Sequence, residues 1–375
     1  MADNKDKKVL NVPALRFPEF TEEWIIQPIK EIADFIGGGT PSSTNETYWQ
    51  GTIPWVSSSD IVEDNIDDIT ISRYITEEAI SNSATKLCPA PVILIVSRVG
   101  VGKIALSRKA ICTSQDFCNL INIKTNPTFL AYSLSRIMKR KSIEAQGTSI
   151  KGITSLEIQK IILRIPCLKE QNRIADLLQL IDKRIATQNK IIEKLETLIK
   201  GIIETVISSQ KPNTLIKNCL ECNSSTLQES QVAETGTFPV YGATGISGYT
   251  ETADINGESI LIIKDGSSVG IVKFVTGEYS YIGTLNSLIA KDGYCLKYIY
   301  FALQRFSFEP YKTGMAIPHI YFKDYGKAKI YCPSLSLQTL IAQKLSLIEN
   351  KMEVEKRIIL CYQLQKSYLL SRMFI

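Results

Sequence analysis

Residues 166–178 read PCLKEQNRIADLL, and 167 positions later the chain repeats this stretch as PSLSLQTLIAQKL at 333–345. At that offset, 14 of the 46 positions from 147 to 192 carry identical residues, which indicates an internal duplication. Each copy begins a run of apolar residues spaced alternately by four and three, and this spacing predicts a long helix with a narrow apolar seam. The duplication therefore predicts two similar halves, each with a variable body followed by a long helix.

The two seams occupy equivalent positions of the repeat. The first comprises Ile174, Leu178, Ile181, Ile185, Gln188, Ile192, Leu195, Ile199, Ile202 and Val206. The second comprises Ile341, Leu345, Ile348, Met352, Glu355, Ile359, Tyr362, Lys366, Leu369 and Met373. A single amphipathic helix could equally lie on a globular core, but two narrow seams in one chain favour pairing as an antiparallel coiled coil.

Three polar residues interrupt these seams. Gln188 and Glu355 stand at equivalent positions, where a polar side chain either fixes the register of the pair or meets a partner protein. Lys366 weakens the far end of the second seam, so we expect fraying or a different contact there.

The remaining sequence predicts two mixed α/β bodies. Strand-rich runs lie at 91–106, 237–252 and 258–275, and helices are predicted at 128–143 and 294–306. Pro212 ends the first long helix, because proline cannot continue it. The predicted division is an N-terminal segment 1–15, a first body 16–166, a long helix 167–210, a second body 211–333 and a second long helix 334–375.

The predicted fold class is therefore α/β (α+β), with two bodies separated by a pair of long antiparallel coiled-coil helices and related by an internal pseudo-two-fold repeat. A helix from 168 to 208 is about 60 Å long at about 1.5 Å per residue. Such a pair of helices could act as a ruler between two bodies that each address one stretch of a DNA duplex. We expect the charged segment 1–10 to be disordered.

Composition excludes several classes of protein. The first 20 residues lack the apolar core of a signal peptide, and no stretch of about 20 uncharged apolar residues predicts a membrane span. Nine scattered cysteines indicate reduced thiols and a cytoplasmic protein. The net charge of +5 is a modest bias that fits localised basic patches.

Motifs for catalysis or metal binding are absent or incomplete. His319 is the single histidine, and it lies in a repeated segment that favours a structural role. Cys219 and Cys222 form one CxxC without a second pair at a zinc-site spacing. GVGK at 100–103 lacks the first glycine and the Ser or Thr of a phosphate-binding loop, and NPTF at 126–129 reads as a turn before a helix. We predict no catalytic residue, no metal and no cofactor on this chain.

What remains is a binding protein, with polar and aromatic loops for base contacts and basic side chains for phosphates. Each such residue could also be an ordinary turn or a solvated surface position. The candidate DNA-binding residues are Trp55, Ser57, Ser58, Ser59, Arg98, Lys103, Arg108, Lys139 and Arg140 in the first body, and Tyr241, Thr244, Tyr249, Lys264 and Lys273 in the second.

Four stretches of the chain carry a resemblance to a known family: PALRFPEFTEEW (13–24), GGGTPSSTNETYWQGTIPWVSSSDI (37–61), PCLKEQNRIADLLQLIDKRIA (166–186) and FPVYGATGISGY (238–249). With them, nearly the whole chain resembles the specificity subunits of type I restriction–modification systems. The second helix start departs from the pattern, since Leu337 stands where the first has Glu170. Any contact that depends on this carboxylate is therefore expected on one side only.

The resemblance implies that each body is a target recognition domain that reads one half of a split double-stranded DNA target. It also implies that the helices dock two methyltransferase subunits, which bring S-adenosylmethionine for N6-adenine methylation, and that restriction subunits join the complex. This chain would then supply recognition without catalysis. The alternatives are a coiled-coil scaffold that binds no DNA and a fused enzyme, which the missing motifs disfavour.

Overall fold

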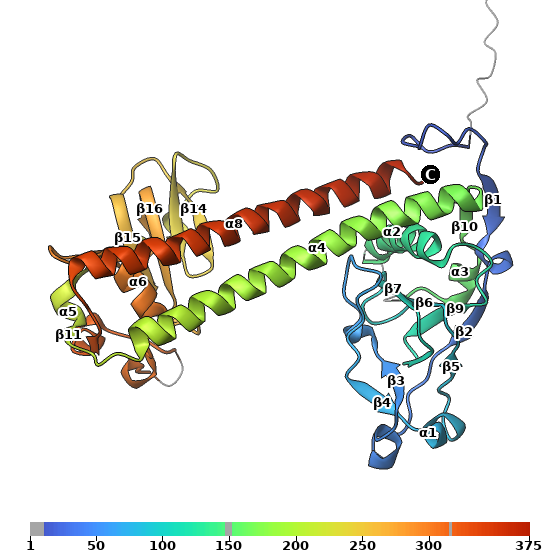
Figure 1. Cartoon of the computed structure of the whole chain (residues 1–375), viewed down its shortest axis with the longest axis horizontal. Helices are drawn as coiled ribbons and strands as arrows, with labels where there is room; N and C mark the ends of the chain where they lie inside the picture. Colours follow the sequence, from blue (N-terminus) through green and yellow to red (C-terminus); the bar gives the residue numbers. More distant parts are fainter. Residues whose placement is uncertain (1–10, 147–151, 315–316) are drawn as a thin grey trace, which may run out of the picture. The chain divides into compact units, whose positions relative to one another are not determined.

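The computed structural model describes residues 11–146, 152–314 and 317–375, and it divides into two compact units. Unit 1 contains the chain up to Thr187 together with Ile358–Ile375, and unit 2 contains Gln188–Arg357. Each unit therefore holds one body and a part of each long helix (Figure 1). The segment 1–10, for which we predict disorder, lies outside the described residues, as do 147–151 and 315–316 of the repeat.

Unit 1 contains two four-stranded sheets, a two-stranded ladder and three helices of its body. The first sheet has the order β2 (Asp34–Gly37), β9 (Phe117–Ile121), β6 (Val92–Val96), β7 (Ile104–Ser107). The second has the order β4 (Arg73–Ile75), β3 (Ile53–Val56), β8 (Ile111–Thr113), β5 (Leu87–Cys88). The ladder pairs β1 (Ile25–Pro28) with β10 (Ile162–Ile165), and the helices are α1 (Glu77–Ser81), α2 (Pro127–Gln146) and α3 (Ser155–Gln159).

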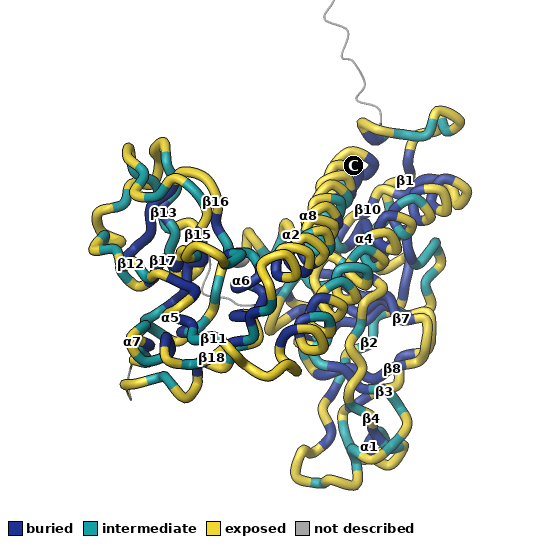
Figure 2. Tube along the Cα trace, turned by 60° about the vertical axis from the view of Figure 1, so that its left-hand side comes forward, coloured by how far each residue is buried: buried dark blue, intermediate teal, exposed yellow. Residues whose placement is uncertain are grey.

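Strand β6 explains why the sequence VILIV has no polar alternation. Ile93 and Ile95 pack in the core that includes α2, whereas Val92, Leu94 and Val96 pack in a second core that includes residues of the other sheet. Both faces of the strand are thus covered, and a continuous apolar run is the expected pattern. In Figure 2 the neighbouring strands β7 and β8 of this body are also coloured as buried.

Three glycines in the 37–51 region are required by close backbone approach. A Cβ atom at Gly38 would collide with the Ser114 carbonyl, and one at Gly39 with the backbone of Ala84. A Cβ atom at Gly51 would collide with the Ile75 carbonyl. These glycines therefore serve packing of the first body.

Unit 2 is built on one six-stranded sheet with the order β12-β17-β15-β16-β13-β14. Its strands are β12 (Leu220–Ser224), β17 (Leu285–Ala290), β15 (Ile255–Ile263), β16 (Val272–Tyr281), β13 (Phe238–Gly242) and β14 (Gly245–Thr250). A short ladder pairs β11 (Thr214–Leu215) with β18 (Lys329–Ile330), and the helices of the body are α5 (Ile216–Cys219), α6 (Leu296–Gln304) and α7 (Phe322–Tyr325). Ile260 and Ile262 of β15 pack in the core that includes α6, and Leu261 and Ile263 pack in a second core.

The long helices are α4 (Leu168–Ile203) and α8 (Leu335–Arg372), and they pack together in antiparallel fashion. In unit 1, Ile174 near the start of α4 shares a core with Met373 at the end of α8. In unit 2, Ile203 at the end of α4 shares a core with Ile341 near the start of α8. The predicted pair of helices and the mixed α/β fold class are confirmed.

The seam of α4 departs from prediction at its last position. Every other predicted position in both helices is buried or half-buried, but Val206 is 39% exposed. A π-helical turn at Glu204–Ser208 follows α4 and alters the periodicity, so that Ile203 and Ile207 are buried instead. The prediction for Val206 was wrong because it assumed an unbroken α-helix.

The polar seam residues behave differently from one another. Lys366 does not fray the helix, since α8 continues to Arg372, and its ammonium contacts Asp182 at 2.6 Å. Glu355 is only 3% exposed and forms an ion pair with Lys351. Among the described residues, Gln188 Oε1 and Glu355 Oε2 are buried without a hydrogen-bond partner.

One repeated glutamine explains why the same helix start occurs twice. The Gln171 side chain donates to the Pro166 carbonyl at 2.9 Å and accepts from the Asn126 backbone N–H at 2.9 Å. Gln338 repeats both contacts, donating to the Pro333 carbonyl at 2.8 Å and accepting from the backbone N–H at residue 295 at 3.0 Å. Each glutamine thus ties the start of a long helix to the helix of the body beside it.

Candidate nucleic-acid interface

The second body brings an aromatic and a basic candidate together. Strand β13 lies beside β16, and the Lys273 ammonium lies 4.7 Å from the centroid of the Tyr241 ring. The Tyr241 ring also packs edge-on against Tyr279, with centroids 5.5 Å apart. Thr244 is exposed in the turn between β13 and β14, and Tyr249 is half-buried on β14. This surface offers stacking area, hydroxyl groups and a positive charge, which suits contact with DNA.

Lys264 belongs to a different loop, which follows β15. Its carbonyl accepts from the Ile320 backbone N–H at 2.9 Å, and its side chain is half-buried. The neighbouring Asp265 carboxylate lies 3.1 Å from His319 Nδ1. The single histidine therefore joins two loops of the second body, in agreement with the structural role that the sequence favours.

The WVSSSD segment of the first body is mostly structural. Trp55 is 3% exposed, its indole N–H donates to the Gly39 carbonyl at 2.9 Å, and Ser58 is 9% exposed. Ser57 caps a short 3-10 turn that ends at Asp60. Trp55 and Ser58 are thus largely covered by the body, and the indole packs in a small core with Ile75 and Cys112.

Ser59 is the exposed residue of this segment. Arg73, which is not among the candidates predicted from the sequence, lies beside the segment. The Arg73 guanidinium lies 4.5 Å from the centroid of the Trp55 ring and donates to Ser57 Oγ at 2.6 Å. It also forms an ion pair with Asp60. Arg73 is separated from the quoted motif along the chain, and only the pairing of β3 with β4 brings it there.

Three basic candidates of the first body contact one loop. The Lys103 ammonium donates to the Ile61 carbonyl at 3.1 Å, Arg108 pairs with Asp67 at 3.4 Å, and Lys139 pairs with Asp64 at 2.9 Å. The Arg108 and Lys139 side chains remain 56% and 65% exposed. Exposed ion pairs of this kind contribute about 0–1 kcal/mol to stability, so a DNA phosphate could replace the carboxylate as the partner of either cation.

Arg98 and Arg140 are exposed. Arg98 borders a cavity of about 400 Å³ whose lining includes Phe35, Phe117 and Gln115. Arg140 lies on α2, one residue after Lys139. The basic candidates of the first body thus spread over the loop after β6, the turn after β7 and helix α2.

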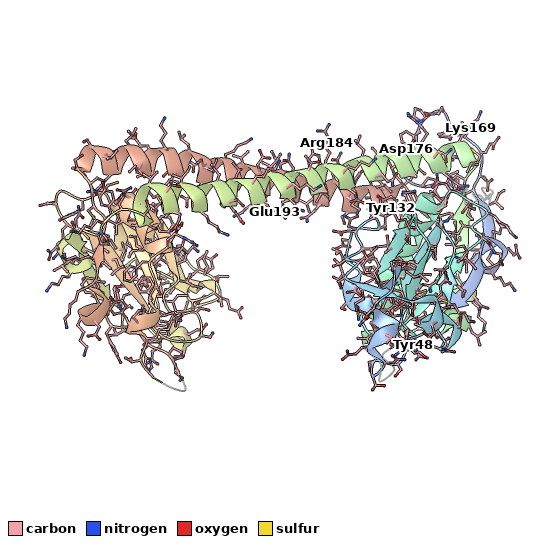
Figure 3. The ribbon with its side chains drawn as sticks, turned by 60° about the horizontal axis from the view of Figure 1, so that its bottom comes forward. Tyr48, Tyr132, Lys169, Asp176, Arg184 and Glu193 are labelled. Atoms are coloured by element: carbon pink, nitrogen blue, oxygen red, sulfur yellow. The ribbon has the colours of Figure 1, made fainter. Side chains whose placement is uncertain are left out.

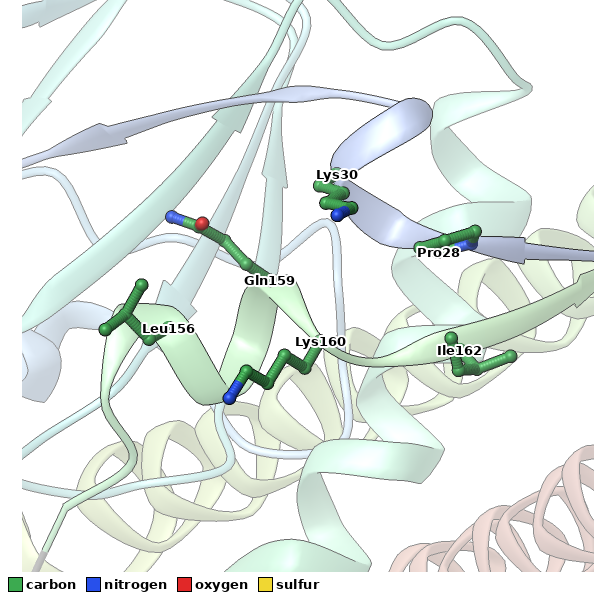
Figure 4. A pocket seen from close by; sticks show the side chains of 6 residues that line it. All are labelled: Pro28, Lys30, Leu156, Gln159, Lys160 and Ile162. Atoms are coloured by element: carbon green, nitrogen blue, oxygen red, sulfur yellow. The ribbon is translucent and has the colours of Figure 1, made fainter.

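A second pocket of about 300 Å³ lies between the β1–β10 ladder and α3 (Figure 4). Its lining comprises Pro28, Lys30, Leu156, Gln159, Lys160 and Ile162. None of these belongs to the candidate DNA-binding residues. Within the described ranges, no group of three His, Cys, Asp or Glu side chains is placed to hold a metal ion. No helix among the described residues is long and apolar enough to cross a membrane.

The fold and these surfaces define a class of protein: a duplicated chain whose two α/β bodies carry basic and aromatic loops and are attached to a pair of long helices. The family model described as "Type I restriction modification DNA specificity domain" matches residues 21–197 and 218–360. The chain belongs to this family, and it is a specificity (S) subunit.

Curated relatives agree with this assignment. The type I restriction enzyme MjaIX specificity subunit of Methanocaldococcus jannaschii is 31% identical over 173 residues, which cover 44% of this chain and 39% of the relative. The EcoR124I/EcoR124II specificity subunit of Escherichia coli is 32% identical over 178 residues, 45% of this chain and 43% of the relative. The chain thus spans about two fifths of the length of these two relatives. The EcoprrI specificity subunit of Escherichia coli is 23% identical over 351 residues, 85% of this chain and 86% of the relative.

Solved structures share the fold. The S subunit of a type I restriction–modification system from M. genitalium matches with a TM-score of 0.67 at 18% identity, covering 97% of this chain and 99% of that one. A chain from a structural study of type I complex assembly matches with a TM-score of 0.54 at 16% identity, covering 93% and 96%. At these identities the likeness concerns the fold alone.

Proposed function

We propose that the two bodies read the two halves of a split double-stranded DNA target, and that α4 and α8 set the spacing between them. The observation that carries this proposal is the duplication: the two bodies are attached to the long helices by the same glutamine contacts at Gln171 and Gln338. A single reading body would need neither the duplication nor a second long helix.

The proposal extends to the partners. Two methyltransferase subunits dock on the long helices and bring S-adenosylmethionine for N6-adenine methylation, and restriction subunits join for cleavage. Family membership supports a complex with methyltransferase and restriction subunits, while the number of each belongs to the proposal. A cytoplasmic location follows from a DNA target in the cell.

DNA binding is tested by mobility shift with a duplex that carries the target, which is mapped first from methylated adenines in the host genome. Binding by the complex with its methyltransferase subunits should weaken by about tenfold or more between 50 and 200 mM salt, because phosphate contacts release counterions. Indifference to DNA at every salt concentration would instead support a coiled-coil scaffold.

The spacing role is tested by lengthening both long helices by one turn between the bodies. One turn adds about 5.4 Å, which corresponds to one or two base pairs at about 3.4 Å each. We expect the preferred spacer to change by that amount while the half-sites stay the same. Altered half-sites with an unchanged spacer would contradict the proposal. An insertion of equal length in the exposed turn at Asp292, which is not a candidate DNA-binding residue, is the control for a general disturbance.

A further inference from the structure

An acidic side chain stands at the same repeat position of each long helix, Asp182 on α4 and Glu349 on α8. Asp182 Oδ1 accepts from the Lys366 ammonium at 2.6 Å, and Oδ2 accepts from the Tyr132 hydroxyl at 2.6 Å. The side chains of Asp182 and Lys366 are 7% and 8% exposed. Figure 3 shows Tyr132 on one side of α4 and the exposed Asp176 on the opposite side.

The same ammonium also reaches a loop of the first body. Lys366 Nζ donates to the Asp64 carbonyl at 2.5 Å and lies 5.5 Å from the centroid of the Tyr132 ring. Asp64 has a positive φ of 60°, and its carboxylate accepts from Lys139 at 2.9 and 3.2 Å. One buried cluster in unit 1 therefore connects α4, α8, α2 and the 61–67 loop.

Unit 2 has a matching arrangement with different residues. Glu349 Oε2 lies 2.8 Å from the Lys297 ammonium, which lies 4.6 Å from the centroid of the Tyr300 ring. Lys297 and Tyr300 are on α6, which occupies the place of α2 in the repeat. Burial and the Glu349 charge raise the pKa of Tyr300 to about 12, so the hydroxyl keeps its proton. In both units a carboxylate of a long helix thus meets a lysine and a tyrosine.

Such a cluster contributes orientation more than stability. The cost of removing two charges from water offsets most of their attraction, so a buried ion pair adds little net stability. Hydrogen bonds, however, are directional, whereas apolar packing is not. A body held only by apolar contacts could rotate slightly on its helix; one held by a carboxylate with two fixed donors has one preferred orientation.

We propose that Asp182 and Glu349 are positioning residues that fix the orientation of each body on the long helices, and that this fixed orientation restricts the complex to one spacer length. This inference rests on the proposed function. The two residues act through the bodies and need not touch DNA themselves.

The test uses the complex with its methyltransferase subunits and three duplexes, one with the native spacer and two with spacers one base pair shorter or longer. The variant replaces the unit 1 cluster by apolar residues, Tyr132→Phe, Asp182→Leu and Lys366→Met together. We expect its melting temperature to stay near that of the parent, while discrimination against the altered spacers falls by about tenfold, the scale of one lost base contact. Discrimination against base changes within either half-site should be unchanged.

Asp176→Asn, an exposed change on the same helix, is the matched control and should leave spacer discrimination unchanged. Glu349→Gln with Tyr300→Phe tests the same property in unit 2 and serves if the triple variant does not fold. Folded variants that keep full spacer discrimination overturn the inference, and so does a uniform loss of affinity for all duplexes. If the parent complex itself shows no target specificity, the proposed function has failed instead.

Discussion

The Arg16–Glu170 pair gives the sharpest prediction, because it is buried and occurs at the start of one long helix only. Arg16 Nε and Nη2 each donate to a different Glu170 oxygen at 2.7 Å, and the two side chains are 13% and 0% exposed. The hydrogen bonds that Arg16 donates to Glu170 raise the pKa of Arg16, so the guanidinium stays charged. The equivalent position in the second half is Leu337, which is 41% exposed.

Arg16→Met should destabilise unit 1 strongly, because it leaves the Glu170 carboxylate buried and unpaired. Breaking a buried pair by removing one partner costs about 3–5 kcal/mol. For a unit of this size, about 2–4 °C per kcal/mol converts this cost to a melting-temperature decrease of roughly 6–20 °C. Differential scanning calorimetry of the full chain measures the change directly.

Two further variants isolate the cause. Arg16→Met with Glu170→Leu should recover most of the loss, because an apolar pair of similar volume is often neutral in place of a buried ion pair. Arg173→Met is the control: its pair with Glu19 spans 3.7 Å and is 62% and 49% exposed, so the cost should be about 0–1 kcal/mol. If Arg16→Met melted within 2 °C of the parent, roughly the effect of a single surface pair, the reasoning would be refuted.

The other predictions concern the seam and the tyrosines. Ile207→Ala should lower the free energy of unfolding, measured with urea, by about 2–5 kcal/mol, whereas Val206→Ala should change it by no more than about 0.5 kcal/mol. Equal decreases would contradict the π-turn. Gln188→Leu with Glu355→Leu should raise the melting temperature, because two oxygens without partners leave the seam; a decrease would show that both are satisfied. Burial and a neighbouring carboxylate raise the pKa of Tyr132, so the stability linked to its proton is present below about pH 10 and decreases as pH rises further. Tyr132→Phe should therefore show a flatter decrease of the urea midpoint above pH 10, and identical slopes would contradict this.

The apolar periodicity predicted the long helices well, because the spacing of a seam can be read from one segment without knowing which segment packs against it. The positions from Ile174 to Ile202, and all ten from Ile341 to Met373, are buried or half-buried. The failure at Val206 has a local cause, since one π-turn changes the periodicity that the prediction extends. Lys366 was read as a weak point, but its partner Asp182 lies 184 positions away along the chain.

Single base-contacting residues were harder to predict. Trp55 was chosen because an indole offers a large surface for stacking. It is buried in a strand, β3, that pairs with β4 and β8, and the sequence does not show which face of a short strand is covered. The Arg108 and Lys139 side chains are exposed and pair with Asp67 and Asp64, which no local sequence pattern indicates. Tyr241 and Lys273 are adjacent only because β13 pairs with β16.

The three close-packed glycines of the first body restrict which substitutions this domain can accept. Exposed positions such as Ser59 and Thr244 should accept a larger side chain, because it would extend into solvent. Gly38, Gly39 and Gly51 do not, because any side chain there would strike a neighbouring backbone. Sequence variation in this domain should therefore leave these three glycines unchanged. Substitution of any of them should disturb the folding of the body, whatever its effect on binding.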